Sequence, residues 1–214
     1  MRREARSAVN GSCAGFPDAL LVDLGNVLVH LHVERFLRRL RERAGDAALA
    51  GDPLFAEEAY HRFARGEIGP REFHAAVEQR LGLAWPYDEF AAAWIDVFEE
   101  NPASVAAVRR MKTHRPVFLL SNTDVLHWEA ICGRWAWTAE FDGLHLSFRV
   151  GIEKPDPRFF RTFLDRHALR AEHCLFVDDL AENVAAARAV GLRAVRQVDP
   201  ETLARTVAEL FNEG

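Results

Sequence analysis

The chain has 214 residues, of which 49% are hydrophobic, and this is enough to bury the core of one globular domain with a smaller companion. Its formal net charge of -5 provides no broad basic surface, which argues against nucleic acid as the main partner. Cys13, Cys132 and Cys174 are widely spaced and form no CxxC pattern, so a disulfide framework or a structural zinc site is not expected. A reducing cytoplasm fits this cysteine usage best, and the oligomeric state is not indicated.

The N-terminal segment, residues 1–17, contains no apolar stretch of the length that a secretory signal needs. An Arg- and Ser-containing start is compatible with an organelle transit peptide, but a short disordered tail is the simpler expectation. No later segment is long and apolar enough to span a membrane. We therefore expect neither a membrane nor a nucleic acid among the partners.

Short apolar runs predict the strands of a parallel sheet. Their continuous hydrophobicity is typical of strands that helices cover on both faces. The runs occupy residues 19–22, 117–120, 174–177 and 192–198, and the alternating run 143–150 predicts a further strand. Helix start signals lie between the runs, where proline follows an N-cap residue at Asn101-Pro102, Asp156-Pro157 and Asp199-Pro200. The alternation predicts an α/β fold with a doubly wound, mainly parallel, Rossmann-like core.

Residues 32–100 interrupt this alternation. Four consecutive segments have apolar residues at helical spacing, and no strand is expected among them. They read VERFLRRLRERAG, DPLFAEEAYHRFARG, GPREFHAAVEQRLG and PYDEFAAAWIDVFEE. We expect a four-helix cap inserted after the first strand, with the core formed by residues 18–31 and 101–214. Tyr60, His61, Arg65 and Trp94 are cap residues that are candidates for facing a site.

Polar residues follow three of the predicted strands. They are Asp23 after the first strand, Ser121 and Asn122 after VFLL, and Asp178 and Asp179 after CLFV. In a parallel sheet the carboxyl ends of the strands lie at one edge, where ligands bind. Three carboxylates at that edge raise each other's pKa unless a cation binds among them, and oxygen ligands suit Mg²⁺. Lys154, in GIEKPDP, is the expected source of further positive charge.

These motifs, taken in order, resemble those of the haloacid dehalogenase superfamily. VDLGNVL is similar to its first motif, LLSN to its second, the lysine of EKPDP to its third and VDDLAEN to its fourth. The helical segment lies where members with a helical (C1-type) cap carry theirs. The DLGNV form resembles a branch that contains sugar-phosphate phosphatases acting on glucose 1-phosphate. The resemblance implies a Mg²⁺-dependent hydrolase of a small phosphate monoester.

The resemblance also implies a role for each motif residue that handles the phosphoryl group. Asp23 would be the nucleophile that forms an aspartyl phosphate. Ser121 would donate a hydrogen bond to a phosphoryl oxygen, and Asn122 would help to position the group. Lys154 would stabilise the charge shared by the nucleophile and the phosphoryl oxygens.

A second set of residues is implied as the protein's share of the metal shell. Asp23 and Asp179 would bind Mg²⁺ through their carboxylates, and Gly25 would bind it through its backbone carbonyl. Asp178 would act indirectly or through water. Asn183 lies where the family places its later polar residue.

Gly25 departs from the family pattern, which usually has an acid-base Asp at this position. Such help is worth on the order of a hundred- to ten-thousand-fold in rate. A sugar 1-phosphate, with its more acidic leaving hydroxyl, needs less of it, and His30 or His32 is another candidate source of the proton. A metal-independent 2-haloacid dehalogenase needs no proton at all and remains an alternative. A non-catalytic binding module on a decayed hydrolase core is the second alternative.

Overall fold

The computed structural model describes residues 16–45 and 57–212. Its main sheet has the strand order β5-β4-β1-β6-β7, and all neighbouring strands are parallel. The strands are β1 (Ala19–Val22), β4 (Val117–Ser121), β5 (Gly143–Leu146), β6 (Cys174–Asp178) and β7 (Arg193–Arg196). The chain runs outward from β1 through β4 to β5 and then returns to β6 and β7 on the other side of β1. The reversal therefore falls at β1, where open α/β sheets form their ligand crevice.

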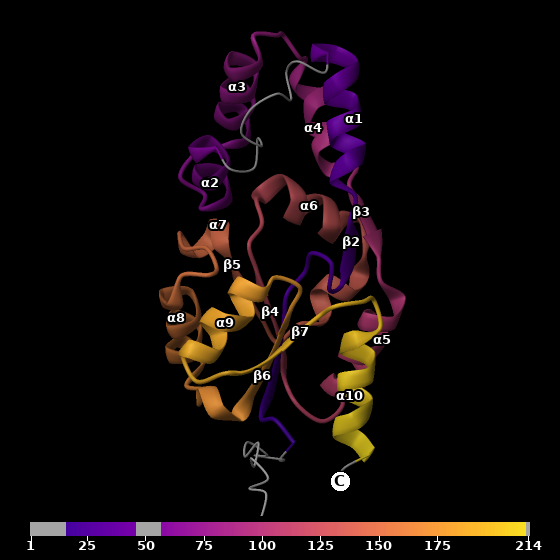
Figure 1. Ribbon diagram of the computed structural model, residues 1–214, viewed down its shortest axis with the longest axis vertical. Helices are drawn as coiled ribbons and strands as arrows, with labels where there is room; N and C mark the ends of the chain where they lie inside the picture. Colours follow the sequence, from indigo (N-terminus) through magenta and orange to yellow (C-terminus); the bar gives the residue numbers. More distant parts are fainter. Residues whose placement is uncertain (1–15, 46–56, 213–214) are drawn as a thin grey trace, which may run out of the picture.

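Helices cover both faces of this sheet, as the continuous hydrophobicity of its strands predicts (Figure 1). Alternate residues of β1 point to opposite faces, so Leu20 and Val22 belong to one buried cluster and Ala19 and Leu21 to the other. The first cluster includes residues of α5 (Pro102–Lys112) and α10 (Thr202–Asn212), and the second includes residues of α8 (Pro157–His167) and α9 (Ala181–Ala189). The α/β prediction is confirmed.

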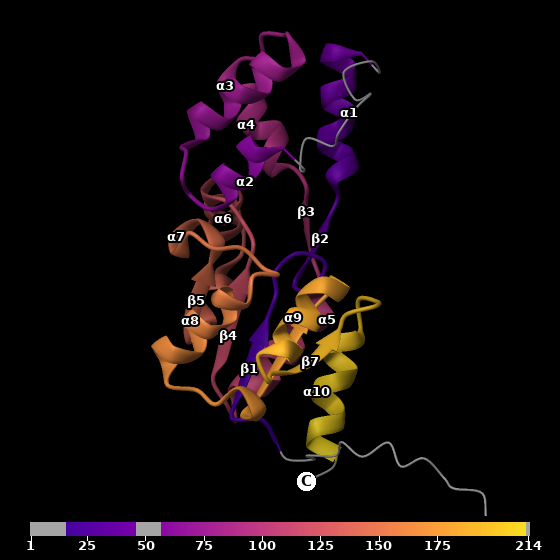
Figure 2. The ribbon, with the colours of Figure 1, turned by 60° about the vertical axis from the view of Figure 1, so that its left-hand side comes forward.

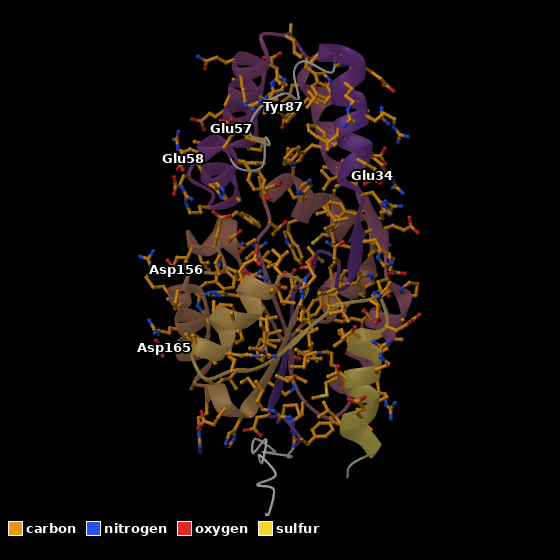
Figure 3. The ribbon with its side chains drawn as sticks, in the orientation of Figure 1. Glu34, Glu57, Glu58, Tyr87, Asp156 and Asp165 are labelled. Atoms are coloured by element: carbon orange, nitrogen blue, oxygen red, sulfur yellow. The ribbon has the colours of Figure 1, made fainter. Side chains whose placement is uncertain are left out.

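Four helices lie together beyond the edge of the sheet where its strands end (Figures 1 and 2). They are α1 (Val33–Ala44), α2 (Glu58–Ala64), α3 (Pro70–Leu81) and α4 (Tyr87–Ile95), and we call them the helical group. Their apolar faces meet in an aromatic cluster in which Phe36, Phe73, Phe90 and Trp94 are buried. Charged side chains such as Glu34 and Glu58 lie on the outer surface of the group (Figure 3).

A short antiparallel ribbon connects the helical group to the sheet. It consists of β2 (Val29–Leu31) and β3 (Phe98–Glu100), which pair with each other. The expectation of no strand within residues 32–100 is therefore wrong at Phe98–Glu100. Phe98 continues the helical spacing of the preceding apolar residues, but α4 ends at Ile95 and the next residues turn into the ribbon.

Two other local predictions need correction. The run 143–150 forms a strand only as far as Leu146, because Ser147 begins the short helix α7 (Ser147–Val150) and its hydroxyl is bonded to the backbone of Thr123. Asp199-Pro200 does not begin a helix directly, since α10 starts at Thr202. The N-caps at Asn101 and Asp156 are confirmed, because each side chain accepts a backbone N–H of its helix.

The remaining described elements complete the connections. They are α6 (Val125–Arg134) and two 3₁₀ segments, η3 (Ala136–Glu140) and η4 (Ala171–His173). Of the predicted tail, residues 1–17, the first fifteen lie outside the described residues, and Phe16 packs on Phe211. None of the described helices has the length and apolarity needed to cross a membrane.

Gly66, directly after α2, brings the helical group into backbone contact with α7. Its φ of +70° is in the left-handed region, and a Cβ at this position would collide with the carbonyl oxygen of Phe148. Only glycine therefore allows α2 to approach α7 this closely.

Candidate active site

Three carboxylates lie together at the carboxyl end of the two central strands. Asp23 follows β1, and Asp178 ends the neighbouring strand β6 and precedes Asp179. The backbone N–H of Asp23 donates to the carbonyl of Val177 at 2.9 Å, which fixes the turn of the chain beyond β1. One oxygen of each carboxylate lies within 4.8 Å of the others. The sequence prediction that these acids meet is thus confirmed, although they are far apart in the chain.

The buried side chain of Lys154 donates hydrogen bonds to two of these acids. Its ammonium group donates to Asp23 Oδ1 at 2.8 Å, to Asp178 Oδ2 at 2.6 Å and to the carbonyl of Leu120 at 2.9 Å. The lysine side chain is only 1% exposed. Burial by itself would lower the pKa of Lys154, but Asp23 and Asp178 raise it above its usual value. The group is therefore a fixed cation.

Asp178 is held on both oxygens by the protein. Oδ1 accepts from the backbone N–H of Leu180 at 2.9 Å and from Asn183 at 3.0 Å, and Oδ2 accepts from Lys154 and, at 3.1 Å, from Asn183. The residue is fully buried. Asp179 is less engaged, because its one side-chain hydrogen bond in the described residues comes from Asn26 Nδ2 at 3.0 Å. The carboxylate of Asp178 is therefore occupied by the protein, whereas that of Asp179 has fewer partners among the described residues.

The three carboxylates repel one another although Lys154 lies between two of them. Burial, together with the neighbouring Asp178 and Asp179, raises the pKa of Asp23 to about 7, although Lys154 acts in the opposite direction. Burial and Asp178 also raise the pKa of Asp179, against the hydrogen bond from Asn26. A cluster of carboxylate oxygens whose negative charges oppose one another is a donor set that fits Mg²⁺.

Asn122 fixes the segment that carries Lys154. Its Nδ2 donates to the carbonyl of Lys154, and its Oδ1 accepts the N–H of the same residue, both at 2.8 Å. Ser121 is buried at the end of β4, and its hydroxyl donates to the carbonyl of Asn122 at 3.3 Å. Asn122 therefore positions the lysine, a function that sequence reasoning missed.

Two cavities meet beside these residues. The carboxylate cleft, of about 510 Å³, is lined by polar residues that include Asp23, Lys154, Asp179 and Asn183. The second, which we call the apolar chamber, has a volume of about 240 Å³. Its walls are Leu24, Gly25, Leu31, Val33, Phe36, Tyr60, Trp94, Val97, Phe98, Ser121, Asn122, Thr123 and His127. Ser121 lines the chamber and not the cleft.

The helical group contributes to both cavities. Tyr60 lines both, His61 lines the carboxylate cleft and Trp94 lines the apolar chamber, whereas Arg65 lines neither. Burial, with Asp124 and Glu153 nearby, raises the pKa of Tyr60, which therefore stays protonated. His61 and Arg65 both contact the Glu153 carboxylate, at 3.2 and 3.3 Å. Glu153 directly precedes Lys154 in the chain. These two contacts join α2 to the segment that carries Lys154.

The turn after Asp23 shows no steric reason for glycine at position 25. Gly25 borders both cavities, and a Cβ there would meet nothing within 4 Å. Asn26 has a φ of +53°, and its side chain bonds both Asp179 and the N–H of Leu31. An asparagine after glycine signals a turn, but no sequence pattern identifies Asp179 as the partner of Asn26. Neither His30 nor His32 lines the carboxylate cleft.

Two phosphatases and a structurally characterised HAD family enzyme are among the proteins to which this chain is similar. The chain is 28% identical over 151 residues to a sesquiterpene phosphatase of Aspergillus oryzae, covering 68% of this chain and 76% of that protein. It is 24% identical over 186 residues to a D-ribitol-5-phosphate phosphatase of Bacteroides thetaiotaomicron, covering 80% and 87%. A HAD family enzyme of the same bacterium has the same fold, with a TM-score of 0.82 at 22% identity over 90% of this chain and 98% of that one. It has also been solved in complex with magnesium and inorganic phosphate, and that structure matches with a TM-score of 0.73 at 23% identity over 84% of this chain and 93% of that one.

A family model described as haloacid dehalogenase-like hydrolase matches residues 17–191. This range includes the three clustered acids, Ser121 and Lys154. The chain therefore belongs to the haloacid dehalogenase-like hydrolase family.

Proposed function

We propose that this hydrolase is a Mg²⁺-dependent phosphatase that cleaves a small phosphate monoester through an aspartyl phosphate on Asp23. The observation that carries the proposal is the meeting of Asp23, Asp178 and Asp179 around the buried ammonium of Lys154. The two phosphatases among the relatives and the magnesium and phosphate complex of the structural neighbour support it.

Each residue of the cleft has a part in this reaction. Asp23 attacks phosphorus with Oδ2, since Oδ1 accepts the hydrogen bond from Lys154, and the bond from phosphorus to the ester oxygen breaks as the aspartyl phosphate forms. The alcohol leaves and takes a proton from water, because Gly25 offers no side-chain acid. Lys154 stabilises the negative charge that collects on the attacking and transferring oxygens. Ser121, which lines the apolar chamber next to the shared residue Asn122, donates its hydroxyl to a phosphoryl oxygen. Water then hydrolyses the aspartyl phosphate and releases inorganic phosphate.

The metal would be held by Asp23, Asp179 and the backbone carbonyl of Gly25, with Asp178 acting through Lys154 and Asn183. When bound, Mg²⁺ supplies positive charge that lets a phosphate dianion approach a carboxylate. The helical group would act as a cap that covers the cleft, excludes water and selects the substrate.

The test is phosphate release from p-nitrophenyl phosphate with Mg²⁺ and with EDTA. We expect activity only with Mg²⁺, and we expect Asp23→Asn to abolish it. Asp165→Asn is the matched control, because Asp165 is an exposed aspartate on α8 (Figure 3). Chloride release from 2-chloropropionate in EDTA would instead establish the dehalogenase, and inactivity toward both compounds would favour the binding module.

A further inference from the structure

The apolar chamber differs in chemistry from the carboxylate cleft beside it. Hydrocarbon side chains from the ribbon, the helical group and the turn after β1 form most of its wall. Leu31, Val33, Phe36, Trp94, Val97 and Phe98 are the main contributors. No Asp, Glu, Lys or Arg lines it among the residues that the structure describes.

Two of the polar side chains in its wall, those of His127 and Asn122, already have partners within the protein. His127 Nε2 lies 2.9 Å from the carbonyl oxygen of Trp94, and its Nδ1 lies 2.8 Å from the Asp124 carboxylate. Both the Nδ2 and Oδ1 atoms of Asn122 are used by Lys154. The hydroxyls of a sugar or polyol would lose water here with few partners in exchange, which is costly.

The chamber opens directly beside the reacting groups. It shares Gly25, Leu31, Tyr60 and Asn122 with the carboxylate cleft. Gly25 lies in the wall of both cavities and a Cβ there would meet nothing within 4 Å, so no side chain separates the two cavities at this position. A phosphate in the cleft would therefore have its ester group directed toward apolar walls.

From this arrangement we infer that the substrate is the phosphate ester of an apolar alcohol whose hydrocarbon part binds in the chamber. The inference rests on the proposed phosphatase function and names its substrate class. An apolar cavity of about 150 Å³ binds benzene, so the chamber's 240 Å³ suits a hydrocarbon of about ten carbons. Of the two phosphatase relatives, the one named for a sesquiterpene fits this chemistry and the one named for a polyol phosphate does not.

The test is the dependence of kcat/KM on chain length for n-alkyl monophosphates from two to fourteen carbons, each below its micelle concentration. Each methylene that enters the chamber should raise kcat/KM by about two- to four-fold. The increase should stop near ten carbons, when the chamber is full. Geranyl phosphate should exceed ribitol 5-phosphate and glucose 1-phosphate by at least a hundred-fold.

Variants locate the effect in the chamber. Leu31→Asn should lower kcat/KM for decyl phosphate at least ten-fold more than for ethyl phosphate. Leu169→Asn is the matched control, since this leucine is also half-buried but lies outside the described cavities, and it should preserve the ratio. Val33→Phe should move the plateau to shorter chains. Circular dichroism checks that each variant is folded.

A binding measurement tests this inference separately from the proposed reaction. Decyl phosphonate should bind the Asp23→Asn protein with Mg²⁺ at least a hundred-fold more tightly than ethyl phosphonate does, as measured by calorimetry. Equal affinities, or a flat dependence of kcat/KM on chain length in an active enzyme, would overturn the apolar substrate and leave the phosphatase intact. Binding that depends on chain length, without any phosphate release by the unsubstituted protein, would overturn the phosphatase and leave the apolar ligand intact.

Discussion

Replacing Lys154 by methionine tests the electrostatic arrangement of the site most directly. Methionine has about the length of the lysine stem but no ammonium group. It removes three hydrogen bonds, two of which go to the carboxylates of Asp23 and Asp178. Both acids are buried and would then face each other with no cation between them.

The expected cost is large because the lost partner is buried. Hydrogen bonds to charged groups contribute about 1.5–3 kcal/mol each, and breaking a buried ion pair by removing one partner costs about 3–5 kcal/mol. We therefore expect Lys154→Met to lower the free energy of unfolding by about 3–5 kcal/mol at pH 8.5 without Mg²⁺. A domain with a stability of roughly 5–15 kcal/mol would be strongly affected.

The loss should depend on pH in a defined direction. The pKa of Asp23 is already raised to about 7, and without Lys154 it rises further. Because the folded protein then binds this proton more tightly than the unfolded chain does, stability falls as the pH rises from the unfolded pKa through the folded one. The cost should shrink to roughly 1–2 kcal/mol at pH 5.5, where Asp23 is neutral.

Urea unfolding followed by tryptophan fluorescence measures both values. Lys112 provides the matched control, since it is the only other lysine and its pair with Asp142 is partly exposed. Lys112→Met should cost under about 1 kcal/mol at either pH. The reasoning fails if Lys154→Met costs no more than Lys112→Met, or if its cost is the same at pH 5.5 and pH 8.5.

Three further predictions concern other parts of the molecule. Burial lowers the pKa of His145 to about 4, so the unfolded chain binds a proton between pH 6.5 and 4 that the folded protein does not, and this proton should remove up to about 3 kcal/mol of stability on acidification; urea unfolding should show that the change in stability from pH 7 to pH 4.5 is less unfavourable in His145→Gln than in the unsubstituted protein, and an identical change in both would contradict it. Asp124→Ala removes the N-cap of α6 and the acceptor of Trp94 Nε1, and should cost about 2–4 kcal/mol, whereas a Tm unchanged within 2 °C would contradict both contacts. Saturating Mg²⁺, at about a hundred times its Kd, should stabilise the protein by about 2.7 kcal/mol, and the shift in Tm should disappear in Asp179→Asn if that acid is a ligand.

The meeting of polar residues at one edge of the sheet was predictable from sequence, because each of them lies at the end of a strand. Asp23, Ser121 and Asp178 each stand where an apolar run stops, and parallel pairing places such positions at one edge. Each of these positions can therefore be identified from the local sequence, and parallel pairing of the strands then brings the residues together. The helices between them were equally visible from spacing and N-caps.

The β2–β3 ribbon and the apolar chamber could not be predicted in the same way. The strands of the ribbon have three residues each, too few to show a period of two, and Phe98 fits the preceding helical spacing as well as it fits a strand. The apolar chamber forms where the turn after β1, the end of α4 and the start of α6 meet. No local pattern distinguishes Phe36 or Trp94, which face both this cavity and the aromatic cluster, from an ordinary core residue.

The close approach at Gly66 has a consequence for how tolerant the chain is to change. Tyr60 and His61 reach the cavities from α2, which ends shortly before Gly66, and the backbone of Gly66 lies directly against the backbone of Phe148 in α7. Even a methyl group inserted there would act as a wedge, tilting the tyrosine and the histidine away from the carboxylates. A residue that touches no substrate would thereby govern whether the two halves of the enzyme are aligned for turnover.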